Sequence, residues 1–318
     1  MNKNHIFCII ILSSMFFSKT VCCQDVCFDC LLKHKADSLF LKQKYYEAIR
    51  IYKQRQSQLY NNYYMIAVNF CQLDLKDSAE YYLQKAIENN FYYNDSFKYN
   101  KIENLNSDKN LPCLHNNSKL DSLLQKNYNK MNENIDENLR KEFLFREKLD
   151  QNVRHNVNID TLSKFYNIAE YHIPEFIDSI NMLFLDSVIQ VIKKWPGIDI
   201  IGRDGDKSAW LFAQHADNFV EFQGKCYKYI EAASEYNNTA LTNVAYLYDR
   251  IMINKGLKQR FATQIRIIDN KVVFIDLEND NEIYLDILRN CYRLSPLKDY
   301  KNGLENKFIE KNQQIRPE

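Results

Sequence analysis

The sequence predicts a mainly α-helical fold, helical hairpins followed by a helical domain with one small β-hairpin, and three observations lead to this expectation. The 318 residues include only 6 Gly and 5 Pro, whereas about 22 Gly and about 16 Pro are typical at this length. All glycines lie between residues 197 and 303, so the first 196 residues lack the residue that tight turns and phosphate loops favour. Apolar residues recur at helical spacing from Leu31 onward. Glycine motifs typical of dinucleotide or P-loop sites do not occur.

The charge balance argues against a nucleic-acid partner. The chain carries 42 Lys and Arg residues against 41 Asp and Glu residues, which gives a formal net charge of +1. Such a balance provides no long-range field that would attract DNA, RNA or an anionic membrane surface. We therefore expect no nucleic acid among the partners of this protein.

The first 23 residues have the layout of a secretory signal peptide. Lys3 provides a charged start, an apolar run covers residues 7–17, and small residues follow up to Cys23. The run is far shorter than the roughly 20 residues that a membrane-spanning helix needs, so we expect no membrane span. Cleavage before Gln24 would give an exported protein, whether periplasmic, cell-surface or secreted. A lipid anchor at Cys22 or Cys23 is the alternative.

Export changes what the cysteines predict. An even number remains after the signal peptide, and an oxidising compartment permits disulfides, whose pairing the sequence leaves open. Cys27 and Cys30 have C-x-x-C spacing, but no βαβ unit surrounds them, so a short local disulfide or two packed thiols is expected rather than a redox site. A zinc site would need a second Cys pair or His partners, and we expect neither a metal nor a cofactor. The six cysteines are Cys27, Cys30, Cys71, Cys113, Cys226 and Cys291.

Residues 24–92 are expected to form antiparallel helical hairpins. The pattern of Ala36 and Ala48 recurs at Ala67 and Ala79, with an offset of 31 residues, and small residues at fixed positions let two helices pack closely. The segment resembles two tetratricopeptide repeats, although the period is below the usual value of about 34 residues and the closing Pro is missing. The resemblance implies either a protein-binding surface or a helical packing platform. Because two repeats rarely stand alone, we expect them to dock on the rest of the chain.

Beyond the hairpins, the chain is expected to continue as a connector, a helical domain and a tail. Residues 93–119 are polar and irregular, which predicts a long connector with one short helix. Helical periodicity resumes at Leu120, and a helical domain is expected over residues 120–303. Residues 304–318 are polar and predict a tail.

Within the helical domain, turn residues bound each element. Trp195-Pro196-Gly197 is expected to end a helix, because Pro lacks a donor and Gly permits the turn. Residues 201–205 predict a compact turn, with Asp206 as the N-cap of the next helix. The predicted helices cover residues 120–153 with a break at 132–136, 161–171, 177–194, 207–217, 219–227, 239–252 and 282–292, and the predicted hairpin strands cover 264–268 and 272–276.

The C-terminal half resembles a family of bacterial domains of unknown function. The resemblance depends on an ordered set of motifs, with one departure at Phe261-Ala262, where the family more often has Tyr-Gly. It implies a domain type but no reaction. The motifs are D-Q-x-x-R at Asp150, Gln151 and Arg154, W-P-x(n)-G at Trp195, Pro196 and Gly202, Q-H-A-D at Gln214–Asp217, A-Y-L-x-D-R at Ala245–Arg250, and Q-x-x-x-T-Q at Gln259, Thr263 and Gln264.

Among these motifs, His215 is the candidate general base, since an imidazole titrates near neutral pH. Asp249 is a candidate catalytic partner, with Asp150 as the other carboxylate that could orient the ring from a neighbouring helix. The hypothesis is a polar pocket around His215, Asp249, Arg250 and Arg154, and the alternative is a buried network that ties helices together. The candidate ligand-binding residues are Asp150, Gln151, Arg154, Gln214, Asp217, Arg250, Gln259 and Gln264.

Two classes of function remain open at this point. The first is an exported binding module on a helical-repeat scaffold, with a protein partner on the repeats or a small anionic ligand in the C-terminal domain. The second is an extracytoplasmic hydrolase or transferase, with His215 as general base and Arg154 or Arg250 as anion binders. No metalloprotease or nucleophile-elbow motif supports a particular hydrolase.

Overall fold

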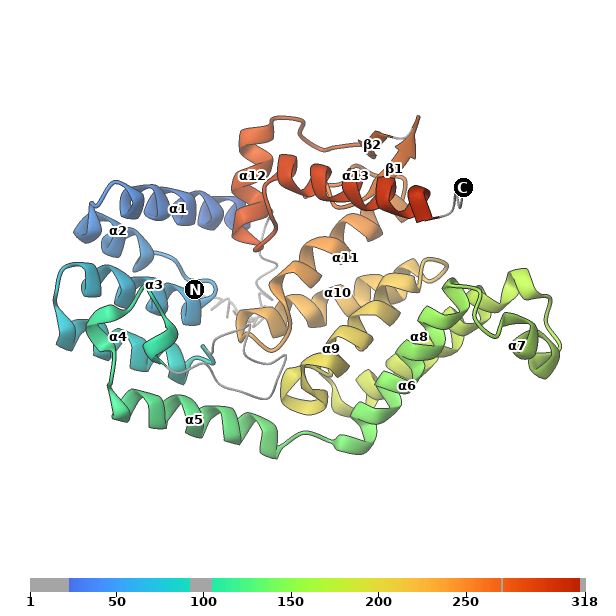
Figure 1. Ribbon diagram of the computed structural model, residues 1–318, viewed down its shortest axis with the longest axis horizontal. Coiled ribbons are helices and arrows are strands. Elements are labelled where there is room, and N and C mark those ends of the chain that lie inside the picture. Colours follow the sequence, from blue (N-terminus) through green and yellow to red (C-terminus); the bar gives the residue numbers. More distant parts are fainter. Residues whose placement is uncertain (1–22, 92–104, 270, 315–318) are drawn as a thin grey trace, which may run out of the picture.

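The computed structural model describes residues 23–91, 105–269 and 271–314, and in them the chain is largely helical with one two-stranded sheet (Figure 1). This confirms the predicted mainly α-helical fold. Among these residues, no helix is both long and apolar enough to cross a membrane. The first helices are α1 (Cys23–Leu41), α2 (Tyr45–Tyr52), α3 (Leu59–Gln72), α4 (Lys76–Glu88), α5 (Ser118–Glu133), α6 (Glu137–Arg154) and α7 (Ile159–Tyr166). The others are α8 (Ile173–Ile192), α9 (Ile198–His215), α10 (Val220–Glu235), α11 (Leu241–Asn254), α12 (Glu282–Cys291) and α13 (Leu297–Gln314).

Helices α1 to α4 form two antiparallel hairpins at one end of the molecule (Figure 1). The alanines that predicted close helix packing, Ala36, Ala48, Ala67 and Ala79, are all fully buried. A side chain of one methyl group allows backbones to approach, and the larger Tyr52 and Tyr60 side chains fill the remaining space. The hairpins therefore pack as the alanine pattern predicted.

The predicted connector is more ordered than its polar composition suggests. Its first part lies outside the described residues, but from residue 105 the chain forms two short 3-10 turns, η2 (Leu105–Ser107) and η3 (Pro112–Leu114). Leu105, Leu111 and Leu114 are fully buried against the hairpins, and a disulfide joins Cys71 of α3 to Cys113. A few apolar anchors and one covalent bond thus fix a segment whose average composition is that of a loop.

Helix α5 runs along the molecule from the hairpins to the second half of the chain, where α6 begins (Figure 1). The break between them falls at the predicted place, since α5 ends at Glu133 and α6 starts at Glu137. Asp136 is the N-cap of α6, and its carboxylate accepts hydrogen bonds from the backbone N–H groups of Asn138 (3.1 Å) and Leu139 (2.9 Å).

The structure breaks the helix within the predicted turn, at Gly202, but the predicted role of Asp206 is wrong. Helix α9 starts at Ile198 and consists of two helical segments that meet at Gly202, whose φ of +71° and ψ of 173° are not helical and suit glycine. Asp206 is not an N-cap but a buried side chain inside this helix. It accepts hydrogen bonds from Trp195 Nε1 (2.7 Å) and Thr239 Oγ1 (3.0 Å). The turn-like sequence therefore marks the break at Gly202, whereas Asp206 lies in the second helical segment and binds the core instead of capping the helix.

The C-terminal segment forms the predicted hairpin and two helices. Strands β1 (Ile265–Ile268) and β2 (Lys271–Phe274) pair antiparallel, with Ile265 opposite Phe274. The expected polar tail is partly wrong, because α13 extends from Leu297 to Gln314 and lies beside the hairpin (Figure 1). The sequence of α13 is mostly polar, so its helical periodicity is weak, but its Tyr300 ring stacks on Phe274 and fixes the start of the helix to β2.

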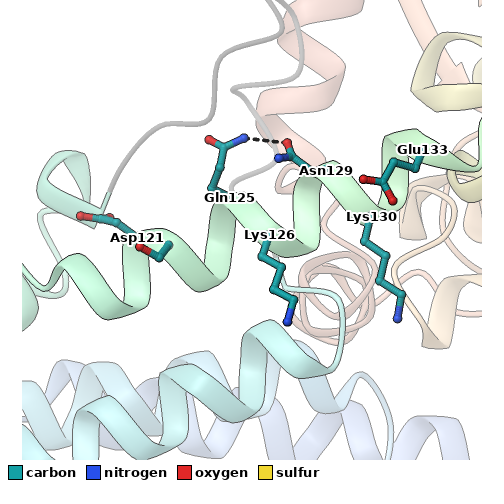
Figure 2. A pocket seen from close by; sticks show the side chains of 7 residues that line it. Asp121, Gln125, Lys126, Asn129, Lys130 and Glu133 are labelled. Carbon is teal, nitrogen blue, oxygen red and sulfur yellow. Dashed lines mark hydrogen bonds between the residues drawn. The ribbon is translucent and has the colours of Figure 1, made fainter.

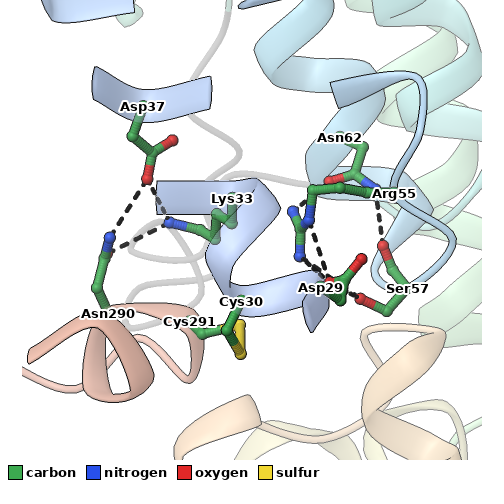
Figure 3. Close-up of a disulfide and its surroundings, with 9 residues drawn as sticks. All are labelled: Asp29, Cys30, Lys33, Asp37, Arg55, Ser57, Asn62, Asn290 and Cys291. Carbon is green, nitrogen blue, oxygen red and sulfur yellow. Dashed lines mark hydrogen bonds and ion pairs between the residues drawn. A yellow bond between two sulfur atoms is a disulfide. The ribbon is translucent and has the colours of Figure 1, made fainter. Parts of the chain in front are cut away.

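A long-range disulfide joins the two halves of the chain. Cys30 of α1 bonds to Cys291 of α12, 261 residues away (Figure 3). The expected association of Cys30 with Cys27 is therefore wrong, because the fold places a distant cysteine against α1. Next to the disulfide, Asn290 and Lys33 both donate hydrogen bonds to Asp37 (Figure 3).

Further polar contacts support the same interface. The Gln58 backbone N–H donates to Glu235 Oε2 (2.9 Å), and Asn237 Nδ2 donates to the Asn90 carbonyl (2.9 Å). The hairpins thus dock on the rest of the chain, as two isolated repeats were expected to do.

Candidate functional site

Three helices bring four ionisable side chains together, and we call these residues the His215 cluster. Asp150 and Arg154 lie in the last turns of α6, Asp178 lies in the first half of α8, and His215 is the last residue of α9. The spacing of four residues places Asp150 and Arg154 on one face of α6, as predicted. Helix α6 packs against both α8 and α9, which carries the other two side chains to the same place.

The His215 ring lies between the two carboxylates. Its Nδ1 is 2.9 Å from Asp150 Oδ1 and 3.9 Å from Asp178 Oδ1. The Arg154 guanidinium pairs with Asp150 (3.4 Å) and with Asp178 (2.5 Å), and its Nε–H points at His215 Nδ1 over 3.2 Å. The Asp150 side chain is 1% exposed, those of Asp178 and His215 are each 18% exposed, and that of Arg154 is 30% exposed. The cluster is therefore sealed on one side and open to solvent on the other.

The two carboxyl groups of the cluster have pKa shifts of opposite sign. Burial disfavours the ionised form of Asp150, but the hydrogen bond and charge of His215, with Arg154, outweigh it and hold the pKa of Asp150 below its ordinary value. At Asp178 burial dominates and raises the pKa to about 6, although Arg154 opposes the shift. Carboxyl groups tuned in opposite directions within one partly exposed cluster are typical of functional sites.

The structure adds two residues that sequence reasoning missed. Asp178 belongs to the cluster, and Asn181 lies one turn further along the same face of α8. Asn181 is 1% exposed, and among the described residues neither its amide nitrogen nor its oxygen has a hydrogen-bond partner. Both residues could have been found in the sequence, because they place an acid and an amide on the otherwise apolar face of a predicted helix. Such positions are rarely occupied by polar groups without a specific reason.

The D-Q-x-x-R and Q-H-A-D motifs each contain one further residue that was predicted to bind a ligand, Gln151 and Gln214. Gln151 Nε2 donates to Asp150 Oδ2 over 2.7 Å and so fills one acceptor position of that carboxylate. Gln214 precedes His215 and is buried, and its Nε2 has no hydrogen-bond partner in the part of the chain that the structure describes. Of the four predicted ligand-binding glutamines, Gln151 therefore contacts the His215 cluster, and Gln214 adjoins His215 in the sequence.

Asp217, Arg250 and Gln264 form a second group with contacts of its own. Arg250 makes a bidentate ion pair with Asp217, at 2.8 Å and 2.5 Å, and its Nη1 donates to Gln264 Oε1 over 3.3 Å. Asn254 also donates to Asp217 (2.9 Å). Burial opposes ionisation of Asp217, but the hydrogen bonds from Arg250 and Asn254 prevail and lower its pKa. This group ties the end of α9 to α11, and its guanidinium already has a carboxylate partner.

Asp249 organises a loop and does not orient His215. Its fully buried carboxylate accepts hydrogen bonds from the backbone N–H groups of Arg260 (2.8 Å), Phe261 (3.0 Å) and Thr263 (3.0 Å), and from Thr263 Oγ1 (2.9 Å). On the other side of the loop, the buried Arg289 donates to the carbonyls of Phe261 (2.6 Å) and Ala262 (3.1 Å). Of the two carboxylates considered as partners of the imidazole, the structure therefore places Asp150 there.

Gln259 completes the same loop. It is fully buried, its Nε2 donates to the carbonyls of Gln264 (2.8 Å) and Ile275, and its Oε1 accepts from the Gln264 N–H (2.9 Å). The Q-x-x-x-T-Q motif thus has a structural role in the geometry observed. The predicted pocket around His215, Asp249, Arg250 and Arg154 is therefore divided. His215 and Arg154 belong to the His215 cluster, whereas Arg250 and Asp249 belong to a second network that Gln264 connects, since it accepts from Arg250 Nη1 (3.3 Å) and donates to Thr263 Oγ1 (3.2 Å).

The backbone conformation of Ala262 has a cost in stability. Ala262 is fully buried with φ +55°, in the left-handed region where alanine is strained by about 1 kcal/mol and glycine is not. We expect Ala262→Gly to raise the free energy of unfolding by up to about 1 kcal/mol in urea titration. The control is Ala232→Gly, an exposed position inside α10, where the same change should lower stability by up to about 1 kcal/mol. Destabilisation by both substitutions would contradict the strain at Ala262.

A hollow of about 870 Å³ lies along α5, away from these groups (Figure 2). It is lined by polar and charged side chains of that single helix, among them Lys126, Lys130 and Glu133. None of the residues predicted to bind a ligand lines it. The hollow therefore gives no support to a site outside the His215 cluster.

Comparison with known proteins places these groups within one family match. A family model described as a family of unknown function (DUF6624) matches residues 137–313. That span starts at the first residue of α6 and includes the His215 cluster and both other groups. No curated protein and no solved structure matches the chain.

Proposed function

The chain belongs to the DUF6624 family of unknown function, and because this membership names no reaction, we propose a function from the geometry of the His215 cluster. The protein is an exported binding protein that holds a small ligand at Asp150, Arg154, Asp178 and His215. The observation that carries this proposal is the convergence of four ionisable side chains from α6, α8 and α9 at a place open to solvent. Charges kept together at such a place, rather than dispersed over the surface, are typical of a site that binds.

The charges of the cluster favour a ligand with a positive rather than a negative group. Arg154 is already paired with Asp150 and Asp178, and Arg250 is already paired with Asp217. Neither guanidinium is left without a counter-charge, so the small anionic ligand expected from the sequence has less support. Two carboxylates against one guanidinium leave negative charge when His215 is neutral.

Two disulfides support the proposed export. Cys30–Cys291 and Cys71–Cys113 both have their sulfur atoms in bonding contact, and such bonds persist mainly in oxidising compartments. In this proposal the signal peptide of residues 1–23 directs the chain out of the cytoplasm. A lipid anchor is the alternative for how the protein is retained. Of its two candidate positions, Cys22 lies outside the described residues and Cys23 is the first residue of α1.

The N-terminal hairpins supply a platform and a surface for a protein partner in this proposal. They resemble tetratricopeptide repeats in the spacing of their buried alanines. Large apolar side chains are exposed on three of their helices, with Phe28 63%, Tyr46 65% and Tyr81 54% exposed. Exposed aromatic residues are enriched where proteins contact each other.

A hydrolase or transferase is the second candidate, and one distance favours it. Asp150 Oδ1 lies 2.9 Å from His215 Nδ1, so a proton on Nδ1 would leave Nε2 free to act as a general base. Asp249 and Arg250 have no part in this version, because their contacts lie elsewhere. The role of Arg154 would be to hold the carboxylates rather than to bind an anion.

Thermal-shift screening of metabolites and peptidoglycan fragments tests the binding proposal. A ligand present at about 100 times its Kd adds about 2.7 kcal/mol to stability, which we expect to raise the Tm of the wild type by about 5 °C. In His215→Gln the same ligand should give no shift, while the folded state is retained by circular dichroism. The control is His172→Gln, since His172 is exposed and outside the cluster. A ligand shift that persists in His215→Gln would contradict the location of the site.

A further inference from the structure

Three atoms of the His215 cluster have the arrangement of metal ligands. One oxygen each of Asp150 and Asp178 and one ring nitrogen of His215 lie within 4.8 Å of one another. Nδ1 of His215 is 2.9 Å from Asp150 Oδ1 and 3.9 Å from Asp178 Oδ1. Ligand atoms that surround a cation at about 2.1 Å are themselves about 3 to 3.5 Å apart. The three atoms therefore need only small movements to share one ion.

His215 Nδ1 faces an acceptor and a donor at once, and no single protonation state of this nitrogen satisfies both. Asp150 Oδ1 is an acceptor at 2.9 Å, and Arg154 Nε–H is a donor directed at the same nitrogen over 3.2 Å. A proton on Nδ1 suits Asp150 but faces the Arg154 hydrogen, and a lone pair on Nδ1 suits Arg154 but faces the Asp150 carboxylate. A cation bound to the Nδ1 lone pair and to Asp150 removes the repulsion between these two acceptors.

A buried amide on the helix face that carries Asp178 provides an independent observation. Asn181 lies one turn after Asp178 on the same face of α8, and both of its polar side-chain atoms lack a partner among the described residues. An unpartnered buried polar atom costs about 1 to 3 kcal/mol. A hydrated ion brings water molecules that can accept from and donate to such amides.

We propose that Asp150, Asp178 and His215 bind one divalent cation, with water in its remaining coordination positions. This inference rests on the proposed function, because it takes the His215 cluster to be a ligand site. One imidazole with two carboxylates suits Zn²⁺ or Mn²⁺ better than the all-oxygen sites of Ca²⁺. Three protein ligands leave a position open, which is the arrangement of metal sites that also take a substrate.

Arg154 is the competitor of the ion. Its guanidinium pairs with both carboxylates, and binding of a cation requires it to turn away from them. Because the Arg154 side chain is 30% exposed and ends a helix, it has solvent to turn into. Removing this charge should therefore strengthen binding of the cation.

Isothermal titration of the tag-free protein with Zn²⁺ and with Mn²⁺, after dialysis against EDTA, tests the proposal. We expect one ion per chain, at least tenfold weaker binding in Asp178→Asn and in His215→Gln, and tighter binding in Arg154→Met. His172→Gln, outside the cluster, should bind as the wild type does. Circular dichroism establishes that each variant is folded.

Two results would overturn the cation site. One is the absence of binding of either ion at 1:1 stoichiometry by the folded wild type, and the other is equal affinity in Asp178→Asn, His215→Gln and the wild type. The proposed function fails separately. If the thermal-shift screen finds an organic ligand that His215→Gln loses while no ion binds, the ligand site stands and the cation does not.

Discussion

Replacement of Asp249 by Ala is expected to lower the free energy of unfolding by about 3 kcal/mol or more. The carboxylate is fully buried and accepts three backbone N–H groups and the Thr263 hydroxyl. Its loss leaves these four donors without partners. Each unpartnered buried donor costs about 1 to 3 kcal/mol, so the summed loss is expected to reach about 3 kcal/mol or more.

Urea unfolding at neutral pH measures this loss. The matched control is Asp280→Ala, an exposed aspartate for which the expected change is within about 0.5 kcal/mol. If Asp249→Ala fails to fold, Asp249→Asn keeps the shape and one acceptor oxygen, and it should still lose about 2 kcal/mol because its NH₂ group faces donors. A loss below about 1 kcal/mol in Asp249→Ala would show that the loop does not depend on this carboxylate.

Removal of the Cys30–Cys291 disulfide is expected to have the second large effect. The double substitution of both cysteines by Ser should lower stability by about 2 to 5 kcal/mol, because the bond restricts a loop of 261 residues in the unfolded chain. The Cys71–Cys113 bond closes a separation of 42 residues, so its removal should cost about 1.5 kcal/mol less on chain entropy alone.

Urea unfolding of the two double variants under oxidising conditions compares these costs. Wild type treated with a thiol reductant should match a further variant in which all four of these cysteines are replaced by Ser. Peptide mapping under non-reducing conditions provides a second measurement. Recovery of Cys30 linked to Cys27, rather than to Cys291, would show that the pairing is not the one described.

The parts of the fold that could be predicted are those set by local chemistry. The second of two helices starts after Asp136 because this residue can cap it. The hairpin around Asp269 follows from two β-prone runs that are separated by turn residues. The closely packed alanines of α1 to α4 follow from their spacing. In each case the residues that carry the signal are neighbours in the sequence.

The parts that could not be predicted depend on residues far apart in the chain. Cys30 pairs with Cys291 because α1 docks on α12, and no local pattern contains this information. The motif residues Asp249 and Gln259 resemble site residues in sequence, but buried backbone groups of one loop occupy their polar atoms. Asp178 was missed because it lies in a helix outside every motif.

The central claim is that the His215 cluster is a ligand site and not a structural network, and pH separates the two. The pKa of Asp178 is higher in the folded than in the unfolded chain. Ionisation of Asp178 therefore favours unfolding, and its contribution to stability falls as pH rises from about 4 through 6. Above pH 6 the charge lowers stability by up to about 3 kcal/mol, which the fold tolerates in order to keep the group at the site.

Urea unfolding of wild type and Asp178→Asn between pH 4 and pH 8, without ligand, is the most direct measurement of this claim. The two proteins should be equally stable at pH 4, where the carboxyl is protonated. At pH 8 Asp178→Asn should be more stable by up to about 3 kcal/mol. A loss of about 3 kcal/mol or more in Asp178→Asn at pH 8 would contradict the claim, because it would show that Arg154 needs this carboxylate to hold the helices together.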